Sequence, residues 1–372
     1  MTMIIDTTLR EGEQSPGVRF TPSQKQQIID GVVRAGVNEM ELGIASPLID
    51  TTADLLAYCK NTHPGLARSL WSRCREEDIR FAAELKADIV SLSLPASDVL
   101  IEKKMEKTRE WTISRLQTAI AFARRLGLQV AVGFEDATRA ELHFLQQLAK
   151  IARQGGAVRL RLADTIGTAS PAEMASMVTE VAKVAGDCRI FVHCHNDFGM
   201  ATANAVTAIE VGAAGADATV LGLGERCGCT RLEELAGYLH LKRHAEYNMG
   251  EIAVLCRYTA RSLGRVIAGN QPFTGEDIFT CETGLHLQAL QKHPETYEPY
   301  TPETVGARRR LLLGPKAGRK AFIGHLRRKG FGVPEHIDDD TIRKMRYCLA
   351  DPTATDDTLA AFLTPLSSAA IS

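Results

Sequence analysis

The sequence repeats one pattern eight times: a short β-branched or apolar run followed by a stretch whose apolar residues have helical spacing. Such alternation is typical of a closed parallel barrel, because parallel strands need helical crossovers and most open sheets contain fewer repeats. The predicted strands span residues 3–8, 39–44, 68–74, 88–94, 129–135, 157–164, 189–196 and 216–224. We therefore expect an α/β fold, a (β/α)8 TIM barrel.

The repeats end before a turn-rich segment, residues 269–275, which follows a predicted helix ending near Leu263. Glycine, proline and asparagine in such a run indicate a linker. The sequence thus predicts a barrel over 1–265, then a linker and a small mixed α/β C-terminal region over 266–372.

Charge and hydropathy narrow the classes of partner. The formal net charge is −1, and acidic and basic residues are interspersed. The sequence as a whole therefore lacks the excess of positive charge expected of a protein that binds nucleic acid or an anionic membrane. No segment is apolar enough to span a bilayer, and the first residues do not resemble an export signal. Nine cysteines without a disulfide framework predict free thiols, and the isolated pair Cys227 and Cys229 argues against a zinc knuckle. We expect a cytoplasmic protein that binds small molecules and copies of itself.

Polar residues stand at or just after the C-terminal ends of most predicted strands. They are Arg10, Glu11, Glu41, Arg75, Glu135, Asp136, Asp164, Thr165, His193, His195, Glu225 and Arg226. Barrel enzymes build their active sites at that rim. The sequence therefore predicts one site at the barrel mouth.

The strongest local pattern is His193-x-His195 in the seventh strand. Side chains two residues apart face the same side of a strand, so both imidazoles can bind one metal ion, or they can be buried histidines with ordinary hydrogen bonds. Glu11 can add a carboxylate across the mouth, leaving positions open for a chelating substrate. Arg10 can stabilise a developing oxyanion or form a surface salt bridge, and Gln14 can donate to substrate.

Several segments make the chain resemble the α-isopropylmalate and homocitrate synthase family of metal-dependent barrel enzymes. The two main ones are LREGEQ at 9–14, with Lys25 following, and FVHCHNDFGMA at 191–201. Further matches are MELG at 40–43, FEDATR at 134–139, LADTIG at 162–167, GLGER at 222–226 and FTCETGLH at 279–286, followed by Tyr297. The pattern is most similar to the homocitrate synthases of nitrogen fixation.

That resemblance implies ligands for a divalent metal, Mg, Mn or Zn: Glu11, His193 and His195. Arg10 would then polarise the keto group of the substrate. Glu135 and His286 would handle the proton of the acetyl methyl group, with Tyr297 assisting. Family members are homodimers in which the segment after the barrel crosses to the neighbour, so His286 and Tyr297 would act in the partner's active site.

The implied reaction is a Claisen-type condensation of acetyl-CoA with an α-keto acid. We expect 2-oxoglutarate, giving homocitrate and CoA. Ketoisovalerate is less favoured, because the chain ends before the regulatory domain typical of leucine-pathway enzymes. Ketoisovalerate, pyruvate and phosphonopyruvate are the alternative acids. Arg75 and Thr165 are the candidates for reading the distal carboxylate, and Gln14 and Glu41 are further substrate-binding candidates.

Three segments depart from the family pattern and keep other functions open. Cys281 and Cys229 replace a usual histidine and asparagine, and LGPKAGR at 313–319 contains Pro315, Lys316 and Ala317 in place of Lys-His-Ser. An acyl-CoA lyase or a non-catalytic relative are the alternatives. Basic residues at 308–310, 316, 319–320 and 327–329 form either a solvated face or a contact for CoA phosphates.

Overall fold

The computed structural model describes residues 2–48, 51–282, 284–314, 317–334, 337–349, 351 and 355–363. The chain divides into two compact units. The first comprises Met1–Ile267 and Pro272–Thr274, and the second comprises Ala268–Gln271 and Gly275–Ser372. Each unit is described by itself.

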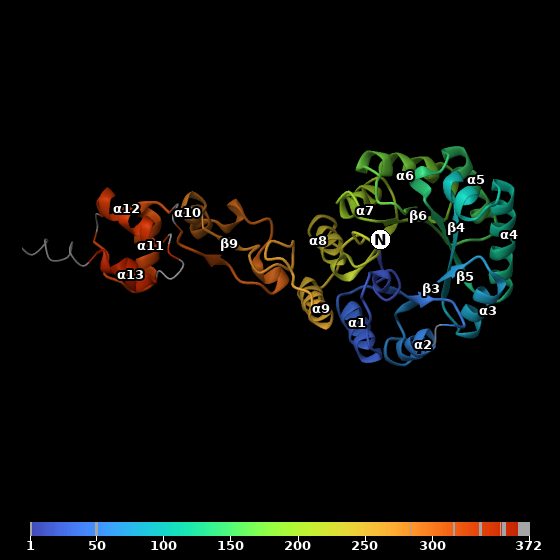
Figure 1. Cartoon of the computed structure of the whole chain (residues 1–372), viewed down its shortest axis with the longest axis horizontal. Helices are drawn as coiled ribbons and strands as arrows, with labels where there is room; N and C mark the ends of the chain where they lie inside the picture. Colours follow the sequence, from blue (N-terminus) through green and yellow to red (C-terminus); the bar gives the residue numbers. More distant parts are fainter. Residues whose placement is uncertain are drawn as a thin grey trace, which may run out of the picture. The chain divides into compact units, whose positions relative to one another are not determined.

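Eight parallel strands of the first unit close into a barrel, in which each strand pairs with the next and β8 pairs with β1 (Figure 1). They are β1 (Met3–Asp6), β2 (Glu39–Ile44), β3 (Ala67–Arg73), β4 (Ile89–Pro95), β5 (Gln129–Glu135), β6 (Arg159–Asp164), β7 (Arg189–Cys194) and β8 (Gly215–Ala218). Helices connect the strands and surround them. The predicted (β/α)8 barrel followed by a smaller C-terminal region is confirmed.

Most strands lie within two residues of their predicted bounds, but one is much shorter. β8 ends at Ala218, whereas the apolar run suggested a strand to residue 224. Residues Val220–Gly222 form a 3₁₀ turn, η4, in which Leu221 and Gly222 have φ values of 60° and 65°. A left-handed backbone cannot continue a strand, so the chain turns here toward the barrel mouth.

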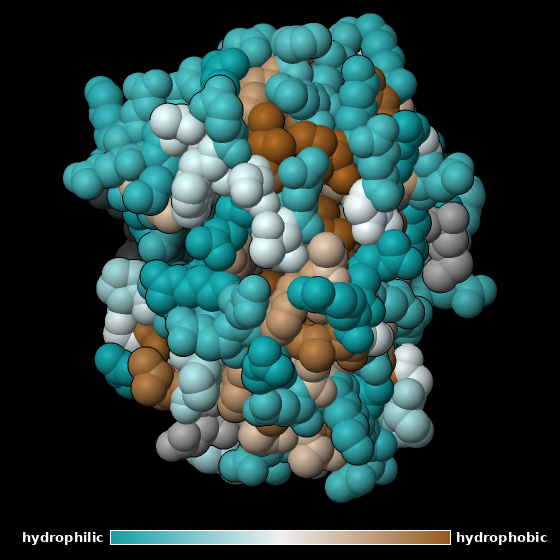
Figure 2. Space-filling view, turned by 90° about the vertical axis from the view of Figure 1, so that its right-hand side faces the viewer, coloured by the Kyte–Doolittle hydropathy of each residue, from teal (hydrophilic) through white to brown (hydrophobic). Residues whose placement is uncertain are grey.

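The helices of the first unit are α1 (Pro22–Arg34), α2 (Thr51–Thr62), α3 (Glu76–Glu84), α4 (Arg109–Arg125), α5 (Leu142–Gln154), α6 (Pro171–Ala185), α7 (Ala201–Glu210), α8 (Leu232–Arg243) and α9 (Met249–Ser262). Thr21 caps the start of α1, forms a reciprocal capping box with Gln24, and precedes Pro22 in the first turn. Figure 2 shows the side near α3, α4 and α5, where the surface is mostly hydrophilic and hydrophobic residues form small areas.

Charged side chains fill part of the barrel interior. Glu39 and Glu41 on β2, and Arg159 and Arg161 on β6, occupy alternate positions that point inward. Arg159 donates from both Nη atoms to the two carboxylate oxygens of Glu39, at 2.7 and 2.6 Å; we call this the lower pair. Arg161 donates to Glu41 at 2.9 Å, two residues closer to the mouth; we call this the upper pair.

The second unit contains β9 (Thr280–Cys281), α10 (Gly284–Lys292), β10 (Arg310–Leu311), α11 (Arg319–Arg328), α12 (Asp339–Cys348) and α13 (Asp356–Ala361). β9 and β10 form a parallel pair. A core of its own joins the helices, built around Leu287, Phe322, Leu326, Ile342 and Met345. This small unit therefore has the apolar packing expected of a compact region.

Part of the basic cluster of the second unit is ion-paired. Both Nε and Nη2 of Arg309 donate to Glu298 at 2.6 Å, and Lys329 lies 3.2 Å from Asp356. Arg319 pairs with Asp339. Neighbouring carboxylates thus neutralise part of the cluster, while Pro315 and Lys316 lie outside the described residues.

Two further predictions concern the whole chain. All nine cysteines are free thiols, as expected. Within the described ranges, no helix combines the length and apolarity that crossing a bilayer demands.

Candidate active site

The C-terminal ends of the strands surround a cavity of about 300 Å³. Each of the eight strands, or the loop that follows it, contributes to the lining: Arg10, Glu11, Gln14, Ile44, Trp71, Ser91, Ser93, Lys104, Gly133, Phe134, Glu135, Arg161, Ala163, Thr165, His193, His195 and Glu225. Residues up to 215 positions apart in the sequence therefore meet at one pocket, as a barrel mouth requires.

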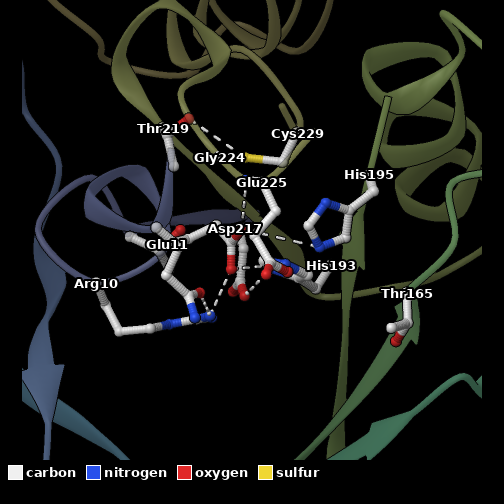
Figure 3. A network of polar contacts seen from close by, with 12 residues as sticks. Arg10, Glu11, Thr165, His193, His195, Asp217, Thr219, Gly224, Glu225 and Cys229 are labelled. Atoms are coloured by element: carbon white, nitrogen blue, oxygen red, sulfur yellow. Dashed lines mark hydrogen bonds and ion pairs between the residues drawn. The ribbon is translucent and has the colours of Figure 1, made fainter. Parts of the chain in front are cut away.

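Three side chains in this pocket could hold a metal ion. Donor atoms of Glu11, His193 and His195 all lie within 4.8 Å of one another, and all three residues are buried (Figure 3). Nε2 of His193 lies 3.7 Å from Oε2 of Glu11, and Nε2 of His195 lies 3.9 Å from Oε1. Two imidazoles and one carboxylate facing a common point fit a divalent cation with open positions.

The protonation states of the cluster suit this role. Burial, reinforced by the neighbouring His193, lowers the pKa of His195 to about 4, so its lone pair is available near neutral pH. Burial alone would raise the pKa of Glu11, but Arg10 and the two histidines outweigh it and hold that pKa below its ordinary value. The group is thus an anionic carboxylate beside neutral imidazole.

Glu11 is held from both sides of the mouth. Arg10 Nη1 lies 2.5 Å from its Oε2, and the backbone N–H of Glu225 donates to its Oε1 at 3.2 Å. Gly224 makes this approach feasible, because a Cβ there would lie 3.2 Å from Oε1 of Glu11. The η4 turn that shortens β8 therefore delivers a backbone donor to the carboxylate.

Asp217, at the end of β8, is a site residue that the sequence analysis missed. Its Oδ2 lies 2.8 Å from Nδ1 of His193, which fixes the ring so that Nε2 faces Glu11. Histidines that bind metals generally use their second nitrogen in this way. The available signal was an isolated acid at an inward position of a strand made otherwise of glycine and alanine.

Glu41 lies beneath the pocket and does not line it. Its carboxylate is fully buried between Nε of Arg10, at 2.6 Å, and Nη1 of Arg161, at 2.9 Å. Burial would raise its pKa, but the two guanidinium groups lower the pKa to about 2. Glu41, a candidate for substrate contact, instead fixes the position of Arg10.

The opposite wall carries Glu135 and Thr165. Ser93 donates to Oε1 of Glu135 at 3.0 Å, and Lys104 lies 3.1 Å from Oε2. The Thr165 hydroxyl oxygen accepts the backbone N–H of Asp136 at 2.8 Å, which leaves the hydroxyl hydrogen to donate into the pocket. Gln14 also lines the pocket and accepts a hydrogen bond from Arg10 at 3.3 Å.

Besides Glu41, three expected site residues do not line this pocket. Arg75 caps the start of α3, its side chain is 58% exposed, and it lies 3.7 Å from Glu77, so its position does not support a role in reading the substrate. His286 and Tyr297 belong to the second unit, where their rings lie 4.0 Å apart between centroids. The two rings contact each other within that unit.

Cys229, which replaces a usual asparagine, is buried but does not join the ligand group found among the described residues. Its Sγ lies 3.2 Å from Oγ1 of Thr219 and donates to the carbonyl oxygen of Leu223 at 3.3 Å (Figure 3). Burial raises the pKa of the thiol, with Glu11 adding to the effect. It is therefore a neutral thiol engaged with its own loop.

Comparison with known proteins agrees with this fold. Residues 2–257 match the family model described as HMGL-like, and residues 273–351 match the model described as homocitrate synthase post-HMGL domain-like. The chain belongs to the HMGL-like family.

Its relatives carry several names. A 2-isopropylmalate synthase 2 of Caldanaerobacter subterraneus subsp. tengcongensis is 36% identical over 94% of this chain and 92% of its own. A homocitrate synthase of Frankia alni is 37% identical over 84% of this chain and 90% of its own. A putative (R)-citramalate synthase of Archaeoglobus fulgidus is 37% identical over 90% of this chain and 69% of its own. The resemblance to this group of synthases, expected from the sequence motifs, is confirmed.

Solved structures support the barrel. An HMG-CoA lyase from Bacillus subtilis has a TM-score of 0.64 at 19% identity, covering 72% of this chain and 95% of its own. At that identity the likeness establishes the fold and no more.

Proposed function

We propose that the chain catalyses the condensation of acetyl-CoA with an α-keto acid, using a divalent metal held by Glu11, His193 and His195. The observation that carries the proposal is the convergence of these three donors, with Arg10 beside them, at the mouth of the barrel. Relatives named as isopropylmalate, homocitrate and citramalate synthases support the same class of reaction. We propose 2-oxoglutarate as the keto acid and homocitrate as the product.

The bond changes define what the residues must do. The methyl group of acetyl-CoA loses a proton to a base, its carbon bonds to the keto carbon, and the keto oxygen takes up a proton to become an alcohol. Water then cleaves the thioester and releases CoA. A bound divalent cation would act as a Lewis acid toward the keto acid.

Arg10 is suited to stabilise the oxygen on which negative charge develops. Its guanidinium is buried and held by Glu41, Glu11 and Gln14, so it is oriented before substrate arrives. A preorganised donor of this kind needs little rearrangement in the transition state. Thr165 can donate a further hydrogen bond from the opposite wall.

Glu135 is the proposed base within the barrel. Its carboxylate lines the pocket with one oxygen on Ser93 and the other near Lys104, which fixes its direction. In a homodimer, His286 and Tyr297 of the partner would complete proton transfer at the acetyl group, and the contact between their rings fits a shared role.

The first test is release of CoA, followed with a thiol reagent, from acetyl-CoA and metal with 2-oxoglutarate, ketoisovalerate, pyruvate or phosphonopyruvate offered separately. We expect turnover with 2-oxoglutarate. Preference for another acid keeps the reaction and changes the product. Silence with all four acids argues for a lyase or a non-catalytic relative.

The metal site has its own test. His193→Ala should lose bound metal and lower turnover by at least about 100-fold, because the ligand and the charge it organises are both removed. His143→Ala, which removes an exposed histidine of α5, is the matched control. An active His193→Ala enzyme with unchanged metal content would refute the site.

A further inference from the structure

Arg161 lies at the floor of the pocket, and its neighbours accept hydrogen bonds from only some of its guanidinium donors. It is 4% exposed, lines the cavity and projects from β6, two residues before Ala163, which stands opposite His193 in the strand register. Two residues along a strand correspond to roughly 6.6 Å. Arg161 is therefore deeper in the barrel than the proposed metal ligands.

The guanidinium of Arg161 retains an unpaired donor. Nη1 donates to Glu41 at 2.9 Å, and Nε forms an ion pair with Oδ2 of Asp217 at 2.9 Å that is not aligned as a hydrogen bond. Nη2 is buried and has no hydrogen-bond partner among the described residues. A buried donor without an acceptor is costly, which indicates that something else completes it.

Unpaired atoms concentrate at this place. Of the nine buried side-chain nitrogen and oxygen atoms without a partner in the described part of the chain, four belong to Arg161, Asp217 and His195. These residues surround the pocket floor and the proposed metal site. The other such atoms of the first unit belong to Arg159, Asn204 and Thr259, one each. A grouping of unpaired polar atoms at a pocket floor is what a ligand-binding site would show.

The shape of the pocket indicates which part of a substrate reaches Arg161. CoA is large and must approach from the open mouth, so the substituent of the keto acid points into the barrel. Gly133 on β5 stands opposite Arg161 in the register and presents no side chain, which keeps the route open. A substituent that ends beside a guanidinium is best recognised if it is a carboxylate.

We propose that Arg161 determines substrate specificity by binding the distal carboxylate of a dicarboxylic α-keto acid. The inference rests on the proposed condensation and adds the residue that reads the second carboxylate. Arg75, the arginine that the sequence suggested for this task, is exposed outside the pocket.

The test compares 2-oxoglutarate with 2-oxopentanoate, which has the same carbon chain without the distal carboxylate. For the wild-type protein we expect a KM about 10- to 100-fold lower for 2-oxoglutarate, the range of a hydrogen bond to a charged group. Arg161→Lys keeps the charge beside Glu41 and loses the forked donor. It should raise the KM for 2-oxoglutarate by a similar factor and leave that for 2-oxopentanoate nearly unchanged.

Arg159→Lys is the matched control, since it alters the lower pair, which does not line the pocket. It should not change the ratio of the two KM values. An equal effect of Arg161→Lys on both acids would mean that Arg161 only supports the barrel. A wild-type preference for 2-oxopentanoate would overturn the inference even if the variant fails to fold.

Binding measured by calorimetry on the Mn-loaded protein separates the two levels of the proposal. Tighter binding of 2-oxoglutarate without any CoA release would support Arg161 as the carboxylate reader and refute the condensation. CoA release with equal binding of the two acids would support the condensation and refute Arg161 as the residue that binds the distal carboxylate. If the protein shows no binding of either acid and no turnover, both the carboxylate-binding role of Arg161 and the condensation are refuted.

Discussion

The upper and lower pairs join the same two strands and differ by only two positions, yet their surroundings differ. In the lower pair, both Nη atoms of Arg159 are used by the two oxygens of Glu39. In the upper pair, Glu41 is shared between Arg161 and Arg10, and both Nε and Nη2 of Arg161 lack a hydrogen-bond acceptor among the described residues. In the lower pair only Nε of Arg159 lacks one there. The same kind of Arg–Glu pair thus uses both Nη atoms of the arginine within the barrel at the lower level and leaves one Nη atom for a ligand at the upper level.

The largest effect should come from removing the shared carboxylate of the upper pair. Glu41→Gln leaves Arg10 and Arg161 buried beside a neutral group, so we expect the free energy of unfolding to fall by about 3–5 kcal/mol near pH 7. Denaturant unfolding measures this. Glu39→Gln should also destabilise the protein, but only Glu41→Gln should impair turnover.

The upper pair also predicts a pH dependence. The pKa of Glu41 is about 2 in the folded protein and 4.5 ordinarily, so its carboxylate stabilises the fold fully above about pH 4.5. That contribution is lost as the pH falls toward 2. The stability difference between wild type and Glu41→Gln should therefore shrink between about pH 4.5 and pH 3, and a constant difference would contradict the pairing.

A smaller effect should follow from Asp217→Asn, which changes the residue that links the upper pair to His193. The amide can no longer hold the imidazole by charge, so we expect metal affinity to fall about 10- to 100-fold. The exchange also removes a buried anionic partner of Arg161, so the free energy of unfolding should fall too. Competition with a chelator measures the affinity. Asp187→Asn, at an exposed aspartate, is the control, and equal affinities would remove Asp217 from the metal site.

The smallest effect is expected when the lower pair is replaced as a unit. Arg159→Met with Glu39→Leu removes both buried charges, and such exchanges are often neutral or stabilising. We expect unchanged KM values and a similar midpoint of thermal unfolding. Loss of activity in this double variant would mean that the two pairs are not separate in function.

The sequence predicted the barrel well, because strand and helix periodicities report burial directly. It also predicted the pocket position of Arg10, Glu11, His193 and His195, since these residues follow or end strands and the barrel topology brings strand ends together. Whether they bind metal is left to the proposed experiments.

Asp217 and Arg161 were missed because their importance depends on which inward side chains meet across the barrel. A clue was present in the pairs Glu39-x-Glu41 and Arg159-x-Arg161, since charges alternating on buried strands require partners. Arg75 was chosen for its place after a strand, but the backbone there starts α3 and turns the side chain outward.

The closure of the first strand onto the last has a consequence for folding. The loop after β1 is held by contacts 209 to 214 residues away in sequence, from Ser15 to Gly224, from Thr8 to Val220 and from Glu11 to the N–H of Glu225. Contacts of such separation form late, because a long loop must be ordered first. A nascent chain that lacks β8 would carry Glu11, His193 and His195 without the frame that joins them. Metal capture at this site would then report that the barrel has closed.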